Sequence, residues 1–249
     1  MSASAKGERL DRVLAQHRLG TRSEVTKFIR QGRVKVDEVL VTDPSIRIGS
    51  AARVTVDDFL LEAPPVLVAW HKPMGVICTV DDPWGRKDLG TEVTEWLRRG
   101  LHPVGRLDAD TSGLLLFSAS GDLTQRLLHP KRRIEKQYRA TLEGPLTPKA
   151  GLALTRQLEA GVETSLGVFR ASGVKVNIEP PTVELVVTEG KNRMVRRMLA
   201  NSGHPAASLM RLRFGNIMLG DLEEGECRPI PDDELAQLQG LTHRAHEEE

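Results

Sequence analysis

Residues 105–118 read GRLDADTSGLLLFS, a polar loop that runs directly into four apolar residues. The apolar run is typical of a buried strand, and Gly105 and Gly113 permit backbone turns or close approaches that other residues resist. Loops held between rigid elements are common places for catalytic groups. The two carboxylates, Asp108 and Asp110, therefore indicate either a catalytic loop or a tight turn in which the aspartates act as caps.

Outward from this loop, residues 66–237 mix strand-like and helical segments. The expected strands are VLVAW (66–70), GLLLFS (113–118), KQYRATLEG (136–144) and TVELVVTEG (182–190). The expected helices span residues 89–99, 123–128, 148–160 and 191–202. This mixture predicts an α+β domain, and no repeat at the spacing of solenoids or propellers is evident.

Residues 8–62 form a smaller predicted module of two helices followed by short strands. Apolar residues at i, i+3 and i+4 predict a first helix near Leu10, and Ser23 is expected to cap a second helix over 24–31. Basic residues cluster on or just after this second helix: Arg22, Lys27, Arg30, Arg33 and Lys35. Such a cluster suits either phosphate binding or an ordinary solvated helix face.

The proline pair in Ala63-Pro64-Pro65 predicts a short stiff linker between this module and the larger domain. At the other end, residues 238–249, which finish in HRAHEEE, are expected to form an acidic tail. Residues 221–249 contain ten acidic residues and two arginines, which leaves 24 acidic and 33 basic residues in 1–220. That surplus of +9 fits a polyanionic partner, and it equally fits an unevenly charged ordinary surface.

The N-terminal sequence MSASAKGERLDRV lacks the apolar run of a secretory signal, and no stretch reaches the roughly 20 apolar residues of a membrane-spanning helix. We therefore expect a cytoplasmic protein without a membrane partner. Cys78 and Cys227 lie far apart without CxxC spacing, and no HExxH occurs. Neither a disulfide framework nor a metal site is expected.

Residues 9–36, RLDRVLAQHRLGTRSEVTKFIRQGRVKV, resemble the S4 RNA-binding domain. The family pattern RLDxxLxxxxxxxSRxxxxxxIxxGxVxV is closely approached, with its Ser and Arg transposed here as Arg22-Ser23. The resemblance implies that the basic helix face grips folded RNA, because phosphate contacts supply affinity without needing base identity.

The loop 105–118 resembles the pseudouridine synthase signature [HG]RLDxDTSGLLL, which surrounds an essential aspartate. The resemblance implies that Asp108 is the catalytic residue, that Asp110 supports the loop, and that Arg106 approaches the RNA where the target nucleotide leaves the stack. The implied reaction cuts uracil from ribose at N1 and rejoins it through C5, with no cofactor and no metal. Asp108 could attack the sugar, attack the base or remove a sugar proton.

A uridine extruded from structured RNA needs an aromatic ring to stack on, close to Asp108. Tyr138, the only tyrosine of the chain, stands at the KxYxV-like position that supplies this ring in the family. A tyrosine in the core or on an edge strand is the other interpretation. The resemblance favours the stacking role.

Residues 189–198, EGKNRMVRRM, resemble the family motif EG[KR]xxxV[KR]RM. By position, Arg196 is the implied partner of the catalytic aspartate, which it would keep ionised by opposite charge at close range. Lys191 and Arg193 are expected to contact RNA. For Arg193 and Arg197 an acidic neighbour or a plain surface role fits as well.

Further segments extend the resemblance across nearly the whole chain: HKPMGVICTVDDPWGRKDL (71–89), GDLTQRLLHP (121–130) and GHPAASLMRLRFGNIMLGDLEEGECRPI (203–230). They resemble the ribosomal branch that carries an S4 domain. Within that branch, the DDPWGRKDL loop and Asn192 with Arg196-Arg197 are more similar to enzymes acting on large-subunit (23S) rRNA. We therefore expect a monomeric enzyme that isomerises a uridine of 23S rRNA, with 16S rRNA as the alternative.

Two other classes of function remain as alternatives. A ribosome-assembly factor that only binds RNA has no need for Asp108, Tyr138 and Arg196 together. A glycosidase-like hydrolase would use Asp108 and Asp110 as paired carboxylates. Only one residue separates these two carboxylates in the sequence, and we expect them to be poorly placed to act together on one substrate bond, so the hydrolase is the more distant alternative.

Overall fold

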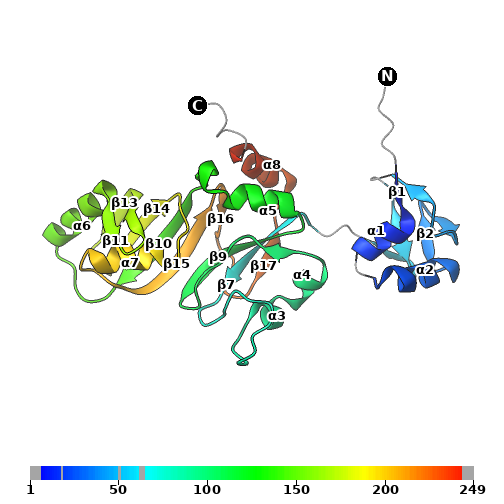
Figure 1. The fold of residues 1–249 in the computed structure, drawn as a ribbon, viewed down its shortest axis with the longest axis horizontal. Helices are drawn as coiled ribbons and strands as arrows, with labels where there is room; N and C mark the ends of the chain where they lie inside the picture. Colours follow the sequence, from blue (N-terminus) through cyan, green and yellow to red (C-terminus); the bar gives the residue numbers. More distant parts are fainter. Residues whose placement is uncertain (1–6, 18, 50–51, 62–64, 243–249) are drawn as a thin grey trace, which may run out of the picture. The chain divides into compact units, whose positions relative to one another are not determined.

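The structure is a computed structural model, and it describes four stretches of the chain: residues 7–17, 19–49, 52–61 and 65–242. The chain divides into two compact units (Figure 1). The first unit extends to Pro65 and includes Glu95–Gly100, and the second unit consists of Val66–Thr94 and the chain from Leu101 onward. Each unit has its own buried core, described below.

In the first unit, two helices pack on a small antiparallel sheet. The sheet has the strand order β3-β2-β5-β6, and β1 pairs with β4 apart from it. The elements are β1 (Glu8–Arg9), α1 (Leu10–Gln16), α2 (Arg22–Arg30), β2 (Val34–Val36), β3 (Val39–Val41), β4 (Arg47–Ile48), β5 (Val54–Val56) and β6 (Phe59–Leu60). The predicted helix pair with short strands is therefore present.

Apolar residues one helical turn apart build the core of this unit. Leu10 and Leu14 of α1 and Val25 and Ile29 of α2 are fully buried and pack against Val34 of β2. Burying a side chain of this size contributes about 1.5–3 kcal/mol relative to leaving it exposed. The two helices are thereby held on one face of the sheet.

The N-cap of α2 is Thr21, which corrects the prediction for Ser23. The Thr21 hydroxyl accepts a hydrogen bond from the backbone N–H of Glu24, and the Thr21 N–H donates to the Glu24 carboxylate at 2.7 Å. This reciprocal arrangement requires a spacing of three residues before the glutamate, which Thr21 has. Ser23 lies within the first turn, where its hydroxyl is too close along the chain to cap.

The second unit contains a mainly antiparallel sheet with the strand order β13-β14-β10-β15-β9-β7-β17. β16 pairs with β15, β8 pairs with β9, and the β15–β9 pair is parallel. The strands are β7 (Leu67–Lys72), β8 (His102–Pro103), β9 (Thr111–Ser118), β10 (Lys136–Leu142), β13 (Ser172–Asn177), β14 (Thr182–Val187), β15 (Ala206–Phe214), β16 (Ile217–Met218) and β17 (Cys227–Pro229). A separate hairpin is formed by β11 (Val162–Thr164) and β12 (Gly167–Phe169).

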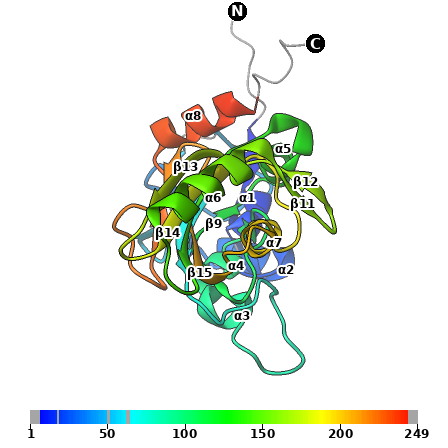
Figure 2. The ribbon, with the colours of Figure 1, turned by 90° about the vertical axis from the view of Figure 1, so that its left-hand side faces the viewer.

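Helices flank this sheet, and the loop between β7 and α3 projects from the unit (Figure 2). The helices of the second unit are α3 (Leu89–Glu92), α5 (Gly121–Leu128), the 3-10 helix η1 (Pro130–Arg132), α6 (Pro148–Ala160), α7 (Met194–Asn201) and α8 (Asp232–Leu241). A further helix, α4 (Thr94–Arg98), belongs to the first unit from Glu95 onward. The predicted helix over residues 148–160 is found with the same bounds.

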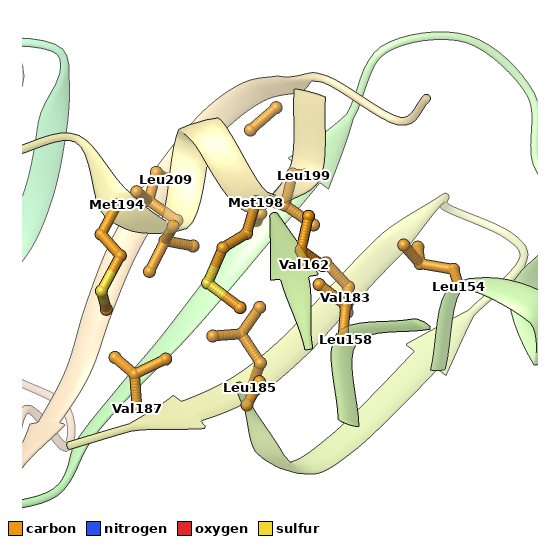
Figure 3. Packing of buried hydrophobic residues seen from close by; sticks show 14 of the residues in the cluster. Leu154, Leu158, Val162, Val183, Leu185, Val187, Met194, Met198, Leu199 and Leu209 are labelled. Carbon is orange, nitrogen blue, oxygen red and sulfur yellow. The ribbon is translucent and has the colours of Figure 1, made fainter. Parts of the chain in front are cut away.

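Two clusters of buried side chains form the core of the second unit. One is contributed by α6, α7, β10 and β14, and its labelled members in Figure 3 include Leu154, Leu158, Val183, Leu185, Met198 and Leu199. The other is contributed by α5, α8, β7 and β9, and includes Leu67, Leu114, Leu116, Leu123, Leu127, Leu235 and Leu238. The parallel pair β9–β15 lies between the two halves of the sheet, so the loop that leads into β9 is at the middle of the unit.

Two of the predicted helices differ from the structure more than the others do. The predicted helix 89–99 is two short helices, α3 and α4, because the backbone at Val93 leaves the helical region (φ −128°, ψ 34°). The predicted helix 191–202 begins only at Met194, because Arg193 adopts a left-handed conformation with φ 52°. Lys191 and Arg193 are therefore loop residues ahead of α7.

The ends of the predicted domains fall partly outside the described residues. Positions 63 and 64 of the predicted linker and positions 243–249 of the predicted tail are among them. α8 continues to Leu241 and buries Leu238 completely, so packed residues extend beyond the predicted boundary at residue 237.

Candidate active site

The loop 105–113 needs glycine at both of its ends. Gly105 has φ +80° and Gly113 has φ +102°, values that L side chains rarely adopt. At Gly113 an ideal Cβ would lie 2.3 Å from the carbonyl oxygen of Arg211, so a side chain there would push β9 away from β15. Gly113 thus permits the parallel pair that places the loop beside β15.

The loop backbone is also held by the segment that follows β7. The N–H of Gly75 donates to the carbonyl oxygen of Ala109 at 2.7 Å, and the N–H of Leu107 donates to Cys78 Sγ at 3.3 Å. Asp108 lies between these two attachment points. Its position therefore depends on residues outside its own motif.

A pocket of about 410 Å³ opens beside this loop. Asp108 and Tyr138 both line it, so the structure brings together two of the three residues predicted to be catalytic. Polar lining residues are Arg106, Asp108, Thr111, Lys136, Tyr138, Glu189, Lys191, Asn192, Arg193 and Arg211. The wall carries five cationic side chains and two carboxylates, a balance that suits an anionic ligand.

Tyr138 reaches the pocket from the middle of β10. Its Cα partner on β15 is Arg211, and partners in adjacent strands project to the same face of a sheet. Lys136, two residues earlier on β10, shares that face. The tyrosine ring is half-buried, which leaves surface for contact with a ligand.

Lys136 and Arg211 are pocket residues that the sequence analysis missed. Both lie over the ring of Phe214, with Lys136 Nζ 5.2 Å and Arg211 Cζ 5.3 Å from its centroid. Burial, together with the neighbouring charge of Arg211, lowers the pKa of Lys136 to about 8. The period-two alternation of KQY could have identified Lys136, since residues i and i+2 of a strand face the same way.

Lys72 is a third buried cation near the loop that the sequence analysis did not identify as functional. It is fully buried, and its Nζ donates to the carbonyl oxygens of Pro73 and Thr111 at 2.9 Å each. Burial lowers the pKa of Lys72, while the charges of Asp108 and Asp110 act in the opposite direction. The positive charge of Lys72 in this position stabilises the ionised carboxylates of Asp108 and Asp110.

Arg196 does not pair with Asp108, which corrects the implied role of this arginine. Its Nη2 donates to the carbonyl oxygen of Asp110, its Nη1 donates to that of Ala206 at 2.9 Å, and its Nε lies 3.3 Å from the Asp110 carboxylate. Within the described residues no ion pair joins Arg196 to Asp108. The reason is the pairing of β15 with β9. Arg196 is bonded to Ala206, the first residue of β15, and Asp110 directly precedes the first residue of β9. The strand pairing therefore brings Asp110 next to Arg196.

The other basic residues of the 189–198 motif have different surroundings. Arg193 makes two hydrogen bonds to the Asp110 carboxylate, and these bonds lower the pKa of that carboxyl. Arg193 thus has an acidic neighbour, which is one of the three interpretations given for it above. Arg197 donates to Ser165 Oγ at 2.9 Å and to the carbonyl oxygen of Asn192. Lys191 is exposed and lines the pocket.

In the first unit, three of the five predicted RNA-binding residues pair with acidic side chains. Arg22 bonds to Asp11, Arg33 to Asp57 and Lys35 to Asp58. Lys27 and Arg30 of α2 are exposed and form no ion pair within the described part of the chain. These two therefore offer the least neutralised charge on α2.

The same unit contains a basic hollow that the sequence analysis did not identify. Arg9, Arg12, Arg22 and Arg47 line it, together with Glu8 and Ala15. Asp11, whose pKa hydrogen bonds from Arg9 and Arg22 lower to about 2, holds two of these arginines in place. The residues are spread over four elements, so neither helical nor strand periodicity marks them as one group.

Comparison with known proteins agrees with this architecture. Residues 66–201 match the RNA pseudouridylate synthase family, and residues 8–54 match the S4 domain. The chain belongs to the RNA pseudouridylate synthase family and carries an N-terminal S4 domain. The predicted α+β fold class and the predicted enzyme class are confirmed, and the substrate of such an enzyme is RNA.

Individual relatives are similar over most of their length. A ribosomal large subunit pseudouridine synthase B of Bacillus subtilis is 32% identical over 94% of this chain and 96% of its own. An RNA pseudouridine synthase of Mycobacterium tuberculosis is 36% identical over 95% of both chains. A solved pseudouridylate synthase structure has 31% sequence identity and a TM-score of 0.59, and the match covers 92% of this chain and 99% of that one.

The described residues contain neither a candidate metal site nor a candidate membrane span. No group of three or more His, Cys, Asp or Glu side chains there is arranged to hold a metal ion. Among the helices in the same residues, none has both the length and the hydropathy that crossing a bilayer requires.

Proposed function

We propose that this enzyme converts one uridine of large-subunit ribosomal RNA to pseudouridine, with Asp108 as its essential carboxylate. The observation that supports this role most directly is the pocket that Asp108 shares with Tyr138. The large-subunit substrate is supported by the names of relatives from Bacillus subtilis, Vibrio cholerae and Haemophilus influenzae, each a ribosomal large subunit pseudouridine synthase B.

In the proposed reaction the target uridine leaves the RNA stack and its base lies on the Tyr138 ring. The bond between N1 and C1′ breaks and a bond between C5 and C1′ forms. C5 loses its proton and N1 gains one, so no electrons are exchanged with a cofactor. Asp108 acts on the sugar or the base, and the cations of Lys136 and Arg211 stabilise negative charge on the detached uracil.

The surrounding basic residues bind the RNA backbone in this proposal. Arg106 and Lys191 lie at the pocket and are exposed. Lys27 and Arg30, which form no ion pair within the described residues, supply positive charge on α2 of the first unit. Arg22, Arg33 and Lys35 hold local acidic partners and contribute less. We further propose that the enzyme acts as a monomer in the cytoplasm, where ribosomal RNA would be available to it.

A pseudouridine map of both ribosomal RNAs tests the substrate. Cells that lack the gene are compared with wild type by carbodiimide adducts and primer extension, and then complemented with wild type or Asp108→Asn. One lost large-subunit site, restored by wild type alone, supports the proposal. A lost small-subunit site contradicts the choice of RNA, and an unchanged map favours an RNA-binding assembly factor.

A further inference from the structure

The loop between β7 and α3 is closed at its base by backbone hydrogen bonds. The N–H of Ile77 donates to the carbonyl oxygen of Lys87, and the N–H of Leu89 donates to that of Thr79, both at 2.9 Å. The segment between these bonds projects from the second unit (Figure 2). The loop is thus a defined projection of the second unit.

Asp82 gives this projection an internal anchor. Its side chain is only 2% exposed, and it accepts hydrogen bonds from the backbone N–H of Arg86 at 2.9 Å and from Arg86 Nη2 at 2.7 Å. Charge-assisted bonds of this kind to a buried carboxylate are stronger than neutral ones. The Arg86 guanidinium is therefore fixed relative to the loop backbone.

Trp84 stands between these two residues and is 78% exposed. The guanidinium of Arg86 lies 5.1 Å from the centroid of its ring and covers one face. By contrast, Trp70 is fully buried and Trp96 is half-buried. An exposed indole ring on an anchored loop has surface available for a stacking contact with a ligand.

The base of the same loop rests on the candidate catalytic loop. Gly75 is bonded to Ala109, and Cys78 accepts the N–H of Leu107, one residue from Asp108. The segment that carries Trp84 therefore starts beside Asp108 and its neighbours. Extrusion of one nucleotide also unstacks its neighbours, which leaves base faces without a partner.

We propose that Trp84 stacks on an unpaired nucleobase of the substrate RNA, outside the catalytic pocket. The inference rests on the proposed function, since it takes the RNA bound for Asp108 as the ligand. Every base has a π-face, so an indole ring binds an unpaired base without selecting its identity. Arg86 and Lys87, both exposed on the same loop, supply positive charge for the adjoining phosphates.

The test uses the full chain and an in vitro transcript of large-subunit rRNA labelled with tritium at uridine C5. Trp84→Ala is expected to raise the dissociation constant roughly ten- to hundredfold, and Trp84→Phe is expected to stay within about threefold of wild type. The slope of log affinity against log salt should be unchanged in both variants, because neither removes a charge. RNA should also quench the tryptophan emission of wild type and do so much less in Trp84→Phe.

Leu152→Ala on α6 is the matched control, because Leu152 is an apolar side chain that is 64% exposed and far along the chain from both loops. It should bind the transcript as wild type does. Equal affinity of wild type and Trp84→Ala for the transcript would contradict stacking of Trp84 on RNA. The same result is expected if the ring binds a protein partner instead. Wild type that releases no tritium contradicts the proposed function itself, so the two failures are distinguishable.

Discussion

The guanidinium of Arg193 forms a two-point ion pair with the carboxylate of Asp110, with nitrogen–oxygen distances of 2.9 and 2.7 Å. Arg196 adds a hydrogen bond to the carbonyl oxygen of the same residue. The start of α7 is therefore attached to the residue two positions after Asp108. In this arrangement the basic motif supports the candidate catalytic loop through Asp110, and Asp108 lines the pocket.

The coupling free energy between Arg193 and Asp110 should be about 1 kcal/mol in favour of the folded state. It is this small because both side chains are about 40% exposed and solvent screens the interaction. A double-mutant cycle of Arg193→Gln and Asp110→Asn, measured by urea unfolding at pH 7, gives this coupling. Additive effects of the two substitutions would contradict it.

The coupling should depend on pH with a defined sign. Arg193 lowers the pKa of Asp110 in the folded chain, so the stabilisation is fully present above the unfolded value of about 3.9. It should be lost as the pH falls through the lower, folded pKa. Repeating the cycle between pH 3 and pH 7 in about four steps checks this, and a coupling that grows on acidification would contradict the assignment.

Lys136 should make stability rise with pH in the alkaline range. Its folded pKa of about 8 is below the unfolded value, so between these values the unfolded chain holds a proton that the folded chain has released. Relative to Lys136→Met, wild type should gain up to roughly 3 kcal/mol in free energy of unfolding from pH 8 to pH 10.5. Urea unfolding of both proteins at several pH values measures the difference, and a constant difference would rule out the shifted pKa.

Gly113→Ala should destabilise the second unit severely. The added Cβ meets the Arg211 backbone at 2.3 Å, and the residue has φ +102°, so the loss should exceed about 3 kcal/mol. Gly121→Ala, at the start of α5, is the control, because its Cβ meets nothing within 4 Å. Thermal unfolding compares the two variants, and a stable Gly113→Ala would show that the strands can separate without cost.

Lys27→Glu combined with Arg30→Glu should weaken RNA binding and reduce its salt dependence, because these exposed side chains form no ion pair in the described residues. Lys149→Glu with Arg156→Glu makes the same charge change on α6 and should have a smaller effect. Filter binding of the rRNA transcript over a range of salt concentrations measures both pairs. An equal loss in the two double variants would indicate a general charge effect.

The sequence predicted the fold class because its strands and longer helices have clear periodicity. The helix 148–160 has a helix-initiating proline and a glycine after its end, and it was found with unchanged bounds. The start of α7 could not be predicted in the same way. Arg193 takes a left-handed backbone conformation, and nothing about an arginine in a basic motif indicates one.

The sequence predicted which residues form the candidate site better than it predicted which of them contact one another. Asp108 and Tyr138 were identified by motif, and the structure places both at one pocket. The partner of Arg196 depends on the register of the parallel strands β9 and β15, which are nearly a hundred residues apart in sequence. Arg211 reaches the pocket through the pairing of β15 with both β9 and β10, so no local pattern could identify it.

The most direct test of the account is tritium release from the uridine-labelled rRNA transcript by purified Asp108→Asn, with binding measured on the same samples. The substitution removes the carboxylate charge and keeps the side-chain size. The account predicts unchanged affinity for the RNA and no tritium release, while Asp110→Asn retains measurable release. Release by Asp108→Asn at the wild-type rate would contradict the central role of this carboxylate.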